Sequence, residues 1–201
     1  MTDLKHRLAM ERRLARRKRR RQEYRRGLRP FAVAAWNISK EHNVGGLVRT
    51  AHASAASEVL LVGEKDWNVE AARTAELYTQ VTMLLDERAL LDHVRTEGYE
   101  LVAVELATEA INLFDAEYPD RPCFLLGAEL EGVPENLLRA SSMVVQIPQW
   151  GLVPSLNLAI AGSIVIYDYL GKLYRKGGLR RPKGGLAPEP PDPPDDADHS
   201  S

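Results

Sequence analysis

Six short apolar runs, separated by segments of helical character, restrict the possible folds of this chain more than any other feature. The runs are FAVAAW (31–36), EVLLVG (58–63), QVTMLL (80–85), ELVAVEL (100–106), CFLLG (123–127) and MVVQIP (143–148). Helical patterns fall between or after them, at about 44–56, 87–97, 134–140 and 155–175. Strands that are apolar on both faces and alternate with helices are typical of a parallel sheet covered on both sides. The pattern therefore predicts an α/β fold, with a parallel sheet flanked by helices.

Charge is strongly segregated along the chain, although the net charge is only −1. Residues 1–29 carry a net charge of +10, residues 30–170 carry −12, and residues 171–183 carry +6. The first segment has high helix propensity up to Gly27, so we expect a helical arm. Dense arginine clusters attract phosphate backbones without reading sequence, which favours a polyanion as the partner of the arm. The alternative is a solvated leader with no specific role.

The C-terminal segment from Gly177 onward is rich in proline, glycine and acidic residues, and we expect it to be disordered. These compositional changes divide the chain into a basic arm at 1–29, a globular domain at 30–176 and a tail at 177–201.

Several classes of protein are disfavoured by composition. No apolar run reaches the roughly 18 residues that a membrane span needs, and no apolar segment follows the cationic N-terminus as in a secretory signal. The single cysteine, Cys123, cannot form an internal disulfide, so a cytoplasmic location fits best. The histidines and the cysteine lack metal-ligand spacing, and the glycines follow neither the P-loop nor the Rossmann pattern. We therefore expect no membrane span and no metal, and a dinucleotide-binding oxidoreductase is disfavoured.

Polar residues and glycines follow three of the predicted strands, where an open α/β sheet binds its ligands. The stretch NISKEHNVGGLVRTA follows the first strand, with Asn43 near a helix start and Arg49 six residues later. GAELEGVP follows the fifth strand and PQWGLVPSLN the sixth. Each stretch alone has an ordinary structural explanation, such as a capped helix, an acidic turn or a loop. Ser155 is the better-placed cap for the last helix, which leaves Asn157 unexplained.

Taken together, the three stretches resemble the motifs of the SPOUT superfamily of RNA methyltransferases, in its TrmH-type (SpoU) branch. NVGGLVRTA resembles the first motif, LLGAELEGVP the second and IPQWGLVPSLNLAIAG the third, and the resemblance covers roughly residues 31–175. It implies a C-terminal deep trefoil knot that binds S-adenosyl-L-methionine, a homodimer, and methylation of a ribose 2′-hydroxyl in structured RNA. Knots are rare, so periodicity alone does not predict one.

The resemblance also implies roles for individual residues by motif position. The residues expected around the cofactor, largely through backbone contacts, are Glu105, Gly127, Ile147 and Leu156. The residues that match the polar catalytic set are Asn43, Arg49, Glu129, Ser155 and Asn157. Two departures from the family pattern could reshape the pocket: Leu130 stands where many relatives have glycine, and Trp150 occupies a loop where smaller residues are common.

The role of Arg49 and the RNA substrate both stay open at this point. Family proposals make this arginine a general base, but a guanidinium with a pKa above about 12 resists deprotonation. Holding a phosphate and stabilising the developing negative charge is easier to justify. The guanosine ribose of the tRNA D-loop is slightly favoured over ribosomal RNA. The alternative from another functional class is a non-catalytic RNA-binding or assembly factor. Loss of Arg49, Asn157 or the loop glycines would indicate such a protein, and all of these residues are present.

Overall fold

A computed structural model describes residues 2–37, 41–63, 67–128, 131–152 and 155–179 of the chain. The strands are β1 Arg29–Trp36, β2 Ala56–Val62, β3 Gln80–Leu84, β4 Glu100–Val104, β5 Ile111–Asn112, β6 Pro122–Leu126 and β7 Met143–Gln146. The α-helices are α1 Thr2–Arg25, α2 Glu41–Ala53, α3 Glu87–Thr96, α4 Glu135–Ala140 and α5 Leu158–Arg175. Short 3₁₀ turns lie at η1 Val69–Ala72, η2 Ala75–Leu77 and η3 Leu113–Asp115.

The strands form one sheet in the order β3-β2-β1-β6-β4-β7-β5, and every pairing in it is parallel. This confirms the predicted fold class. The two-residue edge strand β5 was not predicted, because two residues are too few to show a pattern. Strand β4 pairs with both β6 and β7, so the exits of β6, β4 and β7 are neighbours at one end of the sheet. The site described below lies at these exits.

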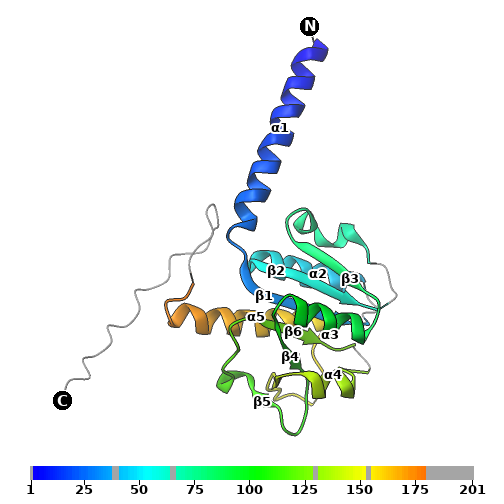
Figure 1. Ribbon diagram of the computed structural model, residues 1–201, viewed down its shortest axis with the longest axis vertical. Helices are drawn as coiled ribbons and strands as arrows, with labels where there is room; N and C mark the ends of the chain where they lie inside the picture. The colour runs from blue at the N-terminus through cyan, green and yellow to red at the C-terminus, as the bar shows by residue number, and fades with distance from the viewer. Residues whose placement is uncertain (1, 38–40, 64–66, 129–130, 153–154, 180–201) are drawn as a thin grey trace, which may run out of the picture.

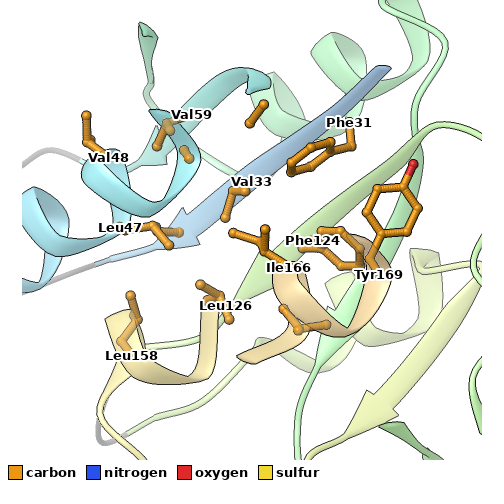
Figure 2. Packing of buried hydrophobic residues seen from close by; sticks show 14 of the residues in the cluster. Phe31, Val33, Leu47, Val48, Val59, Phe124, Leu126, Leu158, Ile166 and Tyr169 are labelled. Atoms are coloured by element: carbon orange, nitrogen blue, oxygen red, sulfur yellow. The ribbon is translucent and has the colours of Figure 1, made fainter. Parts of the chain in front are cut away.

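Both faces of the sheet are covered by apolar packing. On one face, Phe31 and Phe124 of the sheet pack with Ile166 and Tyr169 of α5 and with Leu47 of α2 (Figure 2). On the other face, α3 and α4 pack on the sheet through a second cluster of buried residues that contains Leu60, Leu90, Leu125 and Leu137. Parallel strands buried on both faces explain why the sequence runs are continuously apolar rather than alternating.

Two helices have boundaries that differ by three residues from the sequence-based prediction: α2 at both ends and α5 at its start. Helix α2 spans Glu41–Ala53 rather than 44–56, and β2 begins at Ala56 after the turn at Ala55, whose φ is 58°. Gly45 and Gly46 lie within the helix in both cases, and the packed helix tolerates them. Helix α5 begins at Leu158 rather than at residue 155.

The basic arm is a helix that projects away from the sheet (Figure 1). All residues from 10 to 22 are exposed, and even the apolar Leu14 is 54% exposed. Near its end, the ring of Tyr24 lies 4.7 Å from that of His52 in α2, and the Tyr24 hydroxyl donates a 2.7 Å hydrogen bond to the His52 carbonyl. The arm is therefore helical, and Tyr24 fastens its last turn to α2.

Two further expectations concern features that the described residues show only in part. None of the helices there is long and apolar enough to span a bilayer. The deep trefoil knot stays a prediction of the resemblance, since residues 129–130 and 153–154 of the two motif loops lie outside the described part, as does the tail from 180 onward.

Candidate functional site

A pocket of about 330 Å³ opens at the exits of β4, β6 and β7. Its lining contains all four residues that the resemblance assigns to the cofactor, namely Glu105, Gly127, Ile147 and Leu156. Each follows a strand or lies in the loop before α5, so the parallel order of the sheet brings together residues from separate parts of the chain. The volume lies within the range of about 300–1,000 Å³ that is typical of small-molecule pockets.

The Glu105 carboxylate organises the loop that forms one wall of this pocket. Its Oε2 accepts a 2.9 Å hydrogen bond from the Val133 backbone N–H, and its Oε1 accepts one of 2.9 Å from the N–H of Leu106. The loop closes on itself through two hydrogen bonds between the backbones of Ala128 and Gly132. Glu105 therefore lines the pocket while its carboxylate holds protein backbone.

Two glycines allow this loop to approach itself so closely. A Cβ on Gly127 would lie 2.2 Å from the backbone carbon of Gly132. Gly132 has a φ of 68°, and a Cβ there would lie 2.5 Å from Glu105 Oε2. Side chains at either position would collide with atoms that the pocket wall needs, so the two glycines shape a narrow, backbone-lined cradle.

Asn157, which the sequence left unexplained, is the cap of α5. Its Oδ1 accepts hydrogen bonds from the backbone N–H groups of Ala159 and Ile160, at 3.0 Å and 3.3 Å. Its Nδ2 donates a 2.8 Å hydrogen bond to Oδ1 of Asn43, which is only 1% exposed. The prediction that Ser155 caps this helix is wrong, because the helix starts three residues later and Asn157 then occupies the cap position.

Ser155 instead lines the pocket at the exits of β4, β6 and β7, and is exposed. Gln149 also lines it, a residue that sequence reasoning missed because a glutamine in a loop carries no signal of its own. Trp150 is 84% exposed and does not line the pocket, so this departure from the family pattern leaves the pocket wall unchanged. Glu129 of the expected catalytic set and the second departure, Leu130, lie outside the described residues.

Arg49 does not line this first pocket. It lies on α2 in a second pocket of about 200 Å³, together with His52, Arg73 and Tyr78. Burial lowers the pKa of His52 below its ordinary value, so this ring is neutral near pH 7. No sequence signal connects Arg73 with Arg49, since the segment around 67–78 has neither a strand nor a helix pattern.

The chemistry of the first pocket suits a small molecule that carries both apolar and polar parts. Leu126, Ile147 and Leu158 provide apolar walls, while Gln149 and Ser155 provide polar side chains. Within the part of the chain that the structure describes, no three histidine, cysteine, aspartate or glutamate side chains are grouped so that they could hold a metal ion.

Comparison with known proteins identifies relatives of this chain. The sequence model of the SpoU rRNA Methylase family matches residues 30–167. Over 144 residues the chain is 31% identical to the mouse protein "tRNA (guanosine(18)-2'-O)-methyltransferase TARBP1", covering 68% of this chain and 9% of that protein. It is 27% identical over 141 residues to the Escherichia coli K12 "tRNA (guanosine(18)-2'-O)-methyltransferase", covering 69% of this chain and 62% of that protein. The chain thus spans only part of both relatives.

Solved structures share the fold. The Aquifex aeolicus TrmH/SpoU tRNA modifying enzyme superimposes with a TM-score of 0.73 at 24% identity, over 88% of this chain and 90% of the other. An AdoMet-bound rRNA methyltransferase from Sinorhizobium meliloti gives a TM-score of 0.66 at 28% identity, over 74% and 60% of the two chains.

Proposed function

Because the chain belongs to the SpoU rRNA Methylase family, we propose that it transfers a methyl group from S-adenosyl-L-methionine to a ribose 2′-hydroxyl of RNA. The observation that carries this proposal is the pocket at the exits of β4, β6 and β7, which gathers Glu105, Gly127, Ile147 and Leu156. A guanosine of tRNA is the favoured substrate, because the mouse and Escherichia coli relatives are named for that reaction.

The cradle around Gly127 and Gly132 fits a cofactor held largely by backbone groups, since no side chain projects from either residue. When bound, S-adenosyl-L-methionine supplies an electrophilic methyl group on a sulfonium. In the overall reaction the carbon–sulfur bond breaks, a bond to the ribose O2′ forms, and the hydroxyl proton leaves. The protein has to align the hydroxyl and assist the departure of its proton.

The chain's own polar residues divide this work between two places. Ser155 lines the cofactor pocket, and we infer that its hydroxyl faces the substrate ribose. The Asn43–Asn157 pair joins α2 to the start of α5, so it positions the loop that carries Ser155. Arg49 is exposed in the second pocket. We infer that its guanidinium holds RNA there and stabilises charge that develops on the ribose oxygen.

A homodimer is part of this proposal. Helix α5 buries one face in the core but exposes Ile160 by 54% and Tyr167 by 55%. These two residues lie seven positions apart, which places them on one side of the helix. A second copy of the chain that packs on this side would cover both side chains. Replacing Ile160 with aspartate should then convert the dimer to a monomer in sedimentation experiments.

The experiment that tests the activity uses the full chain, labelled S-adenosyl-L-methionine and an unmodified tRNA transcript. We expect label in the RNA and a single 2′-O-methylated guanosine when the product is mapped. Label in ribosomal RNA but not in tRNA would support the second candidate substrate, which is favoured by the likeness to the Sinorhizobium meliloti rRNA methyltransferase. A protein that binds RNA but transfers no methyl group to either would favour the non-catalytic alternative.

A further inference from the structure

The second pocket, which is separate from the cofactor pocket, combines two arginine side chains from different parts of the chain. Arg49 and His52 come from α2, whereas Arg73 and Tyr78 come from the segment of η1 and η2 that packs against it. Both arginines are exposed. Among the residues that the structure describes, neither guanidinium has a carboxylate within salt-bridge distance.

Close packing holds the two arginines on neighbouring segments. A Cβ on Gly45 would lie 2.5 Å from the Cβ of Ala71, so the lack of a side chain at Gly45 lets η1 rest directly on α2. Ala72 and Ala75 are buried on either side of Arg73, whereas Arg73 itself is exposed. The two buried alanines anchor the segment. The arrangement is therefore built by tight packing and does not depend on chance contacts between long side chains.

The backbone at Arg73 is specialised as well. Arg73 has φ 51° and ψ 50°, and the next residue, Thr74, has φ 76°. Two successive non-glycine residues in left-handed conformation are uncommon and cost free energy, which surrounding packing has to offset. The conformation turns the chain sharply between η1 and η2 at the rim of the pocket, beside the α2 face that carries Arg49.

The pocket also adjoins the basic arm. The ring of Tyr24 lies 4.7 Å from His52 and 6.2 Å from Tyr78, and both of these residues line the pocket. The arm and the two arginines are thus parts of one cationic surface, attached to a domain whose residues 30–170 have a net charge of −12. A polyanion that follows the arm would meet this pocket next.

We propose that Arg49 and Arg73 together hold one backbone phosphate of the RNA, and that Arg73 positions the substrate in this way. This inference rests on the proposed function, and it adds a binding residue that lies outside the three sequence motifs. A guanidinium presents a planar fork of N–H donors that fits phosphate oxygens, and two guanidinium groups can contact both non-bridging oxygens of one phosphate. RNA carries such a phosphate at every nucleotide, so a phosphate held here fixes the neighbouring ribose relative to the methyl donor.

The test replaces Arg73 without disturbing its backbone. Asparagine tolerates the left-handed conformation, so Arg73→Asn removes the charge with little strain, and Arg73→Lys keeps a charge but loses the fork. The matched control is Arg88→Asn, because the Arg88 side chain is 91% exposed on α3, on the opposite face of the sheet. Each protein is assayed with a tRNA transcript for methyl transfer, and RNA binding is measured at several salt concentrations.

We expect Arg73→Asn to raise the KM for tRNA about tenfold and to lower the slope of log affinity against log salt by about 0.7 to 0.9, the loss of one phosphate contact. Arg73→Lys should have the salt slope of the unchanged protein, and its KM should lie between those of the unchanged protein and Arg73→Asn. Arg88→Asn should behave like the unchanged protein. Affinity for S-adenosyl-L-methionine should stay the same in all of them.

The outcomes separate this inference from the proposed function. If the unchanged protein methylates tRNA and Arg73→Asn leaves both KM and salt slope unaltered, the phosphate site is refuted and the function stands. If the unchanged protein transfers no methyl group but Arg73→Asn still lowers the salt slope of tRNA binding, the function fails and the phosphate site stands. If Arg88→Asn lowers the salt slope of tRNA binding as much as Arg73→Asn does, the phosphate site is refuted. The change in slope would then depend only on the net charge of the protein.

Discussion

Asn157 Nδ2 donates a 2.8 Å hydrogen bond to Asn43 Oδ1. The two residues are 114 positions apart in the chain, and their hydrogen bond joins the start of α5 to α2. The same Asn157 side chain caps α5 through its Oδ1. A second polar contact joins these helices further along, where the hydroxyls of Thr50 and Ser163 lie 2.8 Å apart. These two contacts therefore fix the position of the third-motif loop, which precedes α5, relative to the first-motif helix α2 at the edge of the cofactor pocket.

Replacing Asn157 with alanine removes both the cap and the bond to Asn43. Loss of a cap costs about 1 kcal/mol, and removing one partner of a buried polar group costs about 1–3 kcal/mol, so we expect the free energy of unfolding to fall by about 2–4 kcal/mol. Asn157→Ser keeps a capping oxygen and should lose roughly half as much. Urea unfolding measures both. Equal losses for the two variants would mean that the cap contributes nothing.

A side chain at Gly132 should disrupt the cofactor cradle. Alanine there would be strained by the φ of 68° and would place its Cβ 2.5 Å from Glu105 Oε2. We expect Gly132→Ala to weaken S-adenosyl-L-methionine binding about tenfold or more in calorimetry, with a loss of stability of about 1–3 kcal/mol from the strained conformation. Gly151→Ala is the control, because nothing lies within 4 Å of the added methyl group. Similar affinities for the two variants would contradict this account of the cradle.

Arg49 should be needed for methyl transfer but not for cofactor binding. It lies outside the cofactor pocket, so Arg49→Ala should leave affinity for S-adenosyl-L-methionine unchanged while lowering kcat/KM for RNA by about a hundredfold or more. Arg49→Lys should also fail, because an ammonium cannot reproduce the bidentate fork. Methyl transfer and calorimetry on the same preparations check both parts. A variant that retains full activity would show that this arginine takes no part in the reaction.

Tyr24 should control the mobility of the basic arm. Burial raises the pKa of Tyr24 to about 12, so the hydroxyl stays protonated and donates to His52 at any pH near neutrality. Tyr24→Ala should free the arm, whereas Tyr24→Phe keeps the ring contact and should free it only slightly. The buried single cysteine, Cys123, permits a fluorescent label at Leu14→Cys. Fluorescence anisotropy of that label then reports arm motion, and an unchanged anisotropy in Tyr24→Ala would contradict the anchoring role.

Removing the charge of the arm should weaken RNA binding and flatten its dependence on salt. Deletion of residues 1–26 should have this effect, since fewer counterions are released from the RNA. A variant with glutamine at five arm positions keeps the helix while removing five charges: Arg16, Arg17, Arg19, Arg20 and Arg21. The corresponding five lysine replacements retain the charge and serve as the control. Salt slopes equal to that of the unchanged protein would identify the arm as a solvated leader.

The strands and the order of the motifs were readable from sequence because both depend on local patterns. Continuous apolar runs such as residues 122–126 report burial on both faces directly, and the structure places that run in the middle of the sheet. The grouping of Glu105, Gly127 and Ile147 follows from the rule that parallel strands end at one edge. The helix boundaries were less certain, because Asn157 and Ser155 are both good capping residues and only packing decides between them.

The sequence by itself determined the class of fold, the charge of the arm and the motifs that line the cofactor pocket, because propensity, burial and charge are properties of short segments. Only the tertiary structure decided that Asn157 caps α5 and reaches Asn43, that Arg49 lies outside the cofactor pocket, and that Arg49 and Arg73 line the same second pocket. These relationships depend on which distant segments pack together. The close approach of η1 to α2 at Gly45 depends on the same packing, and no local pattern in the chain encodes it.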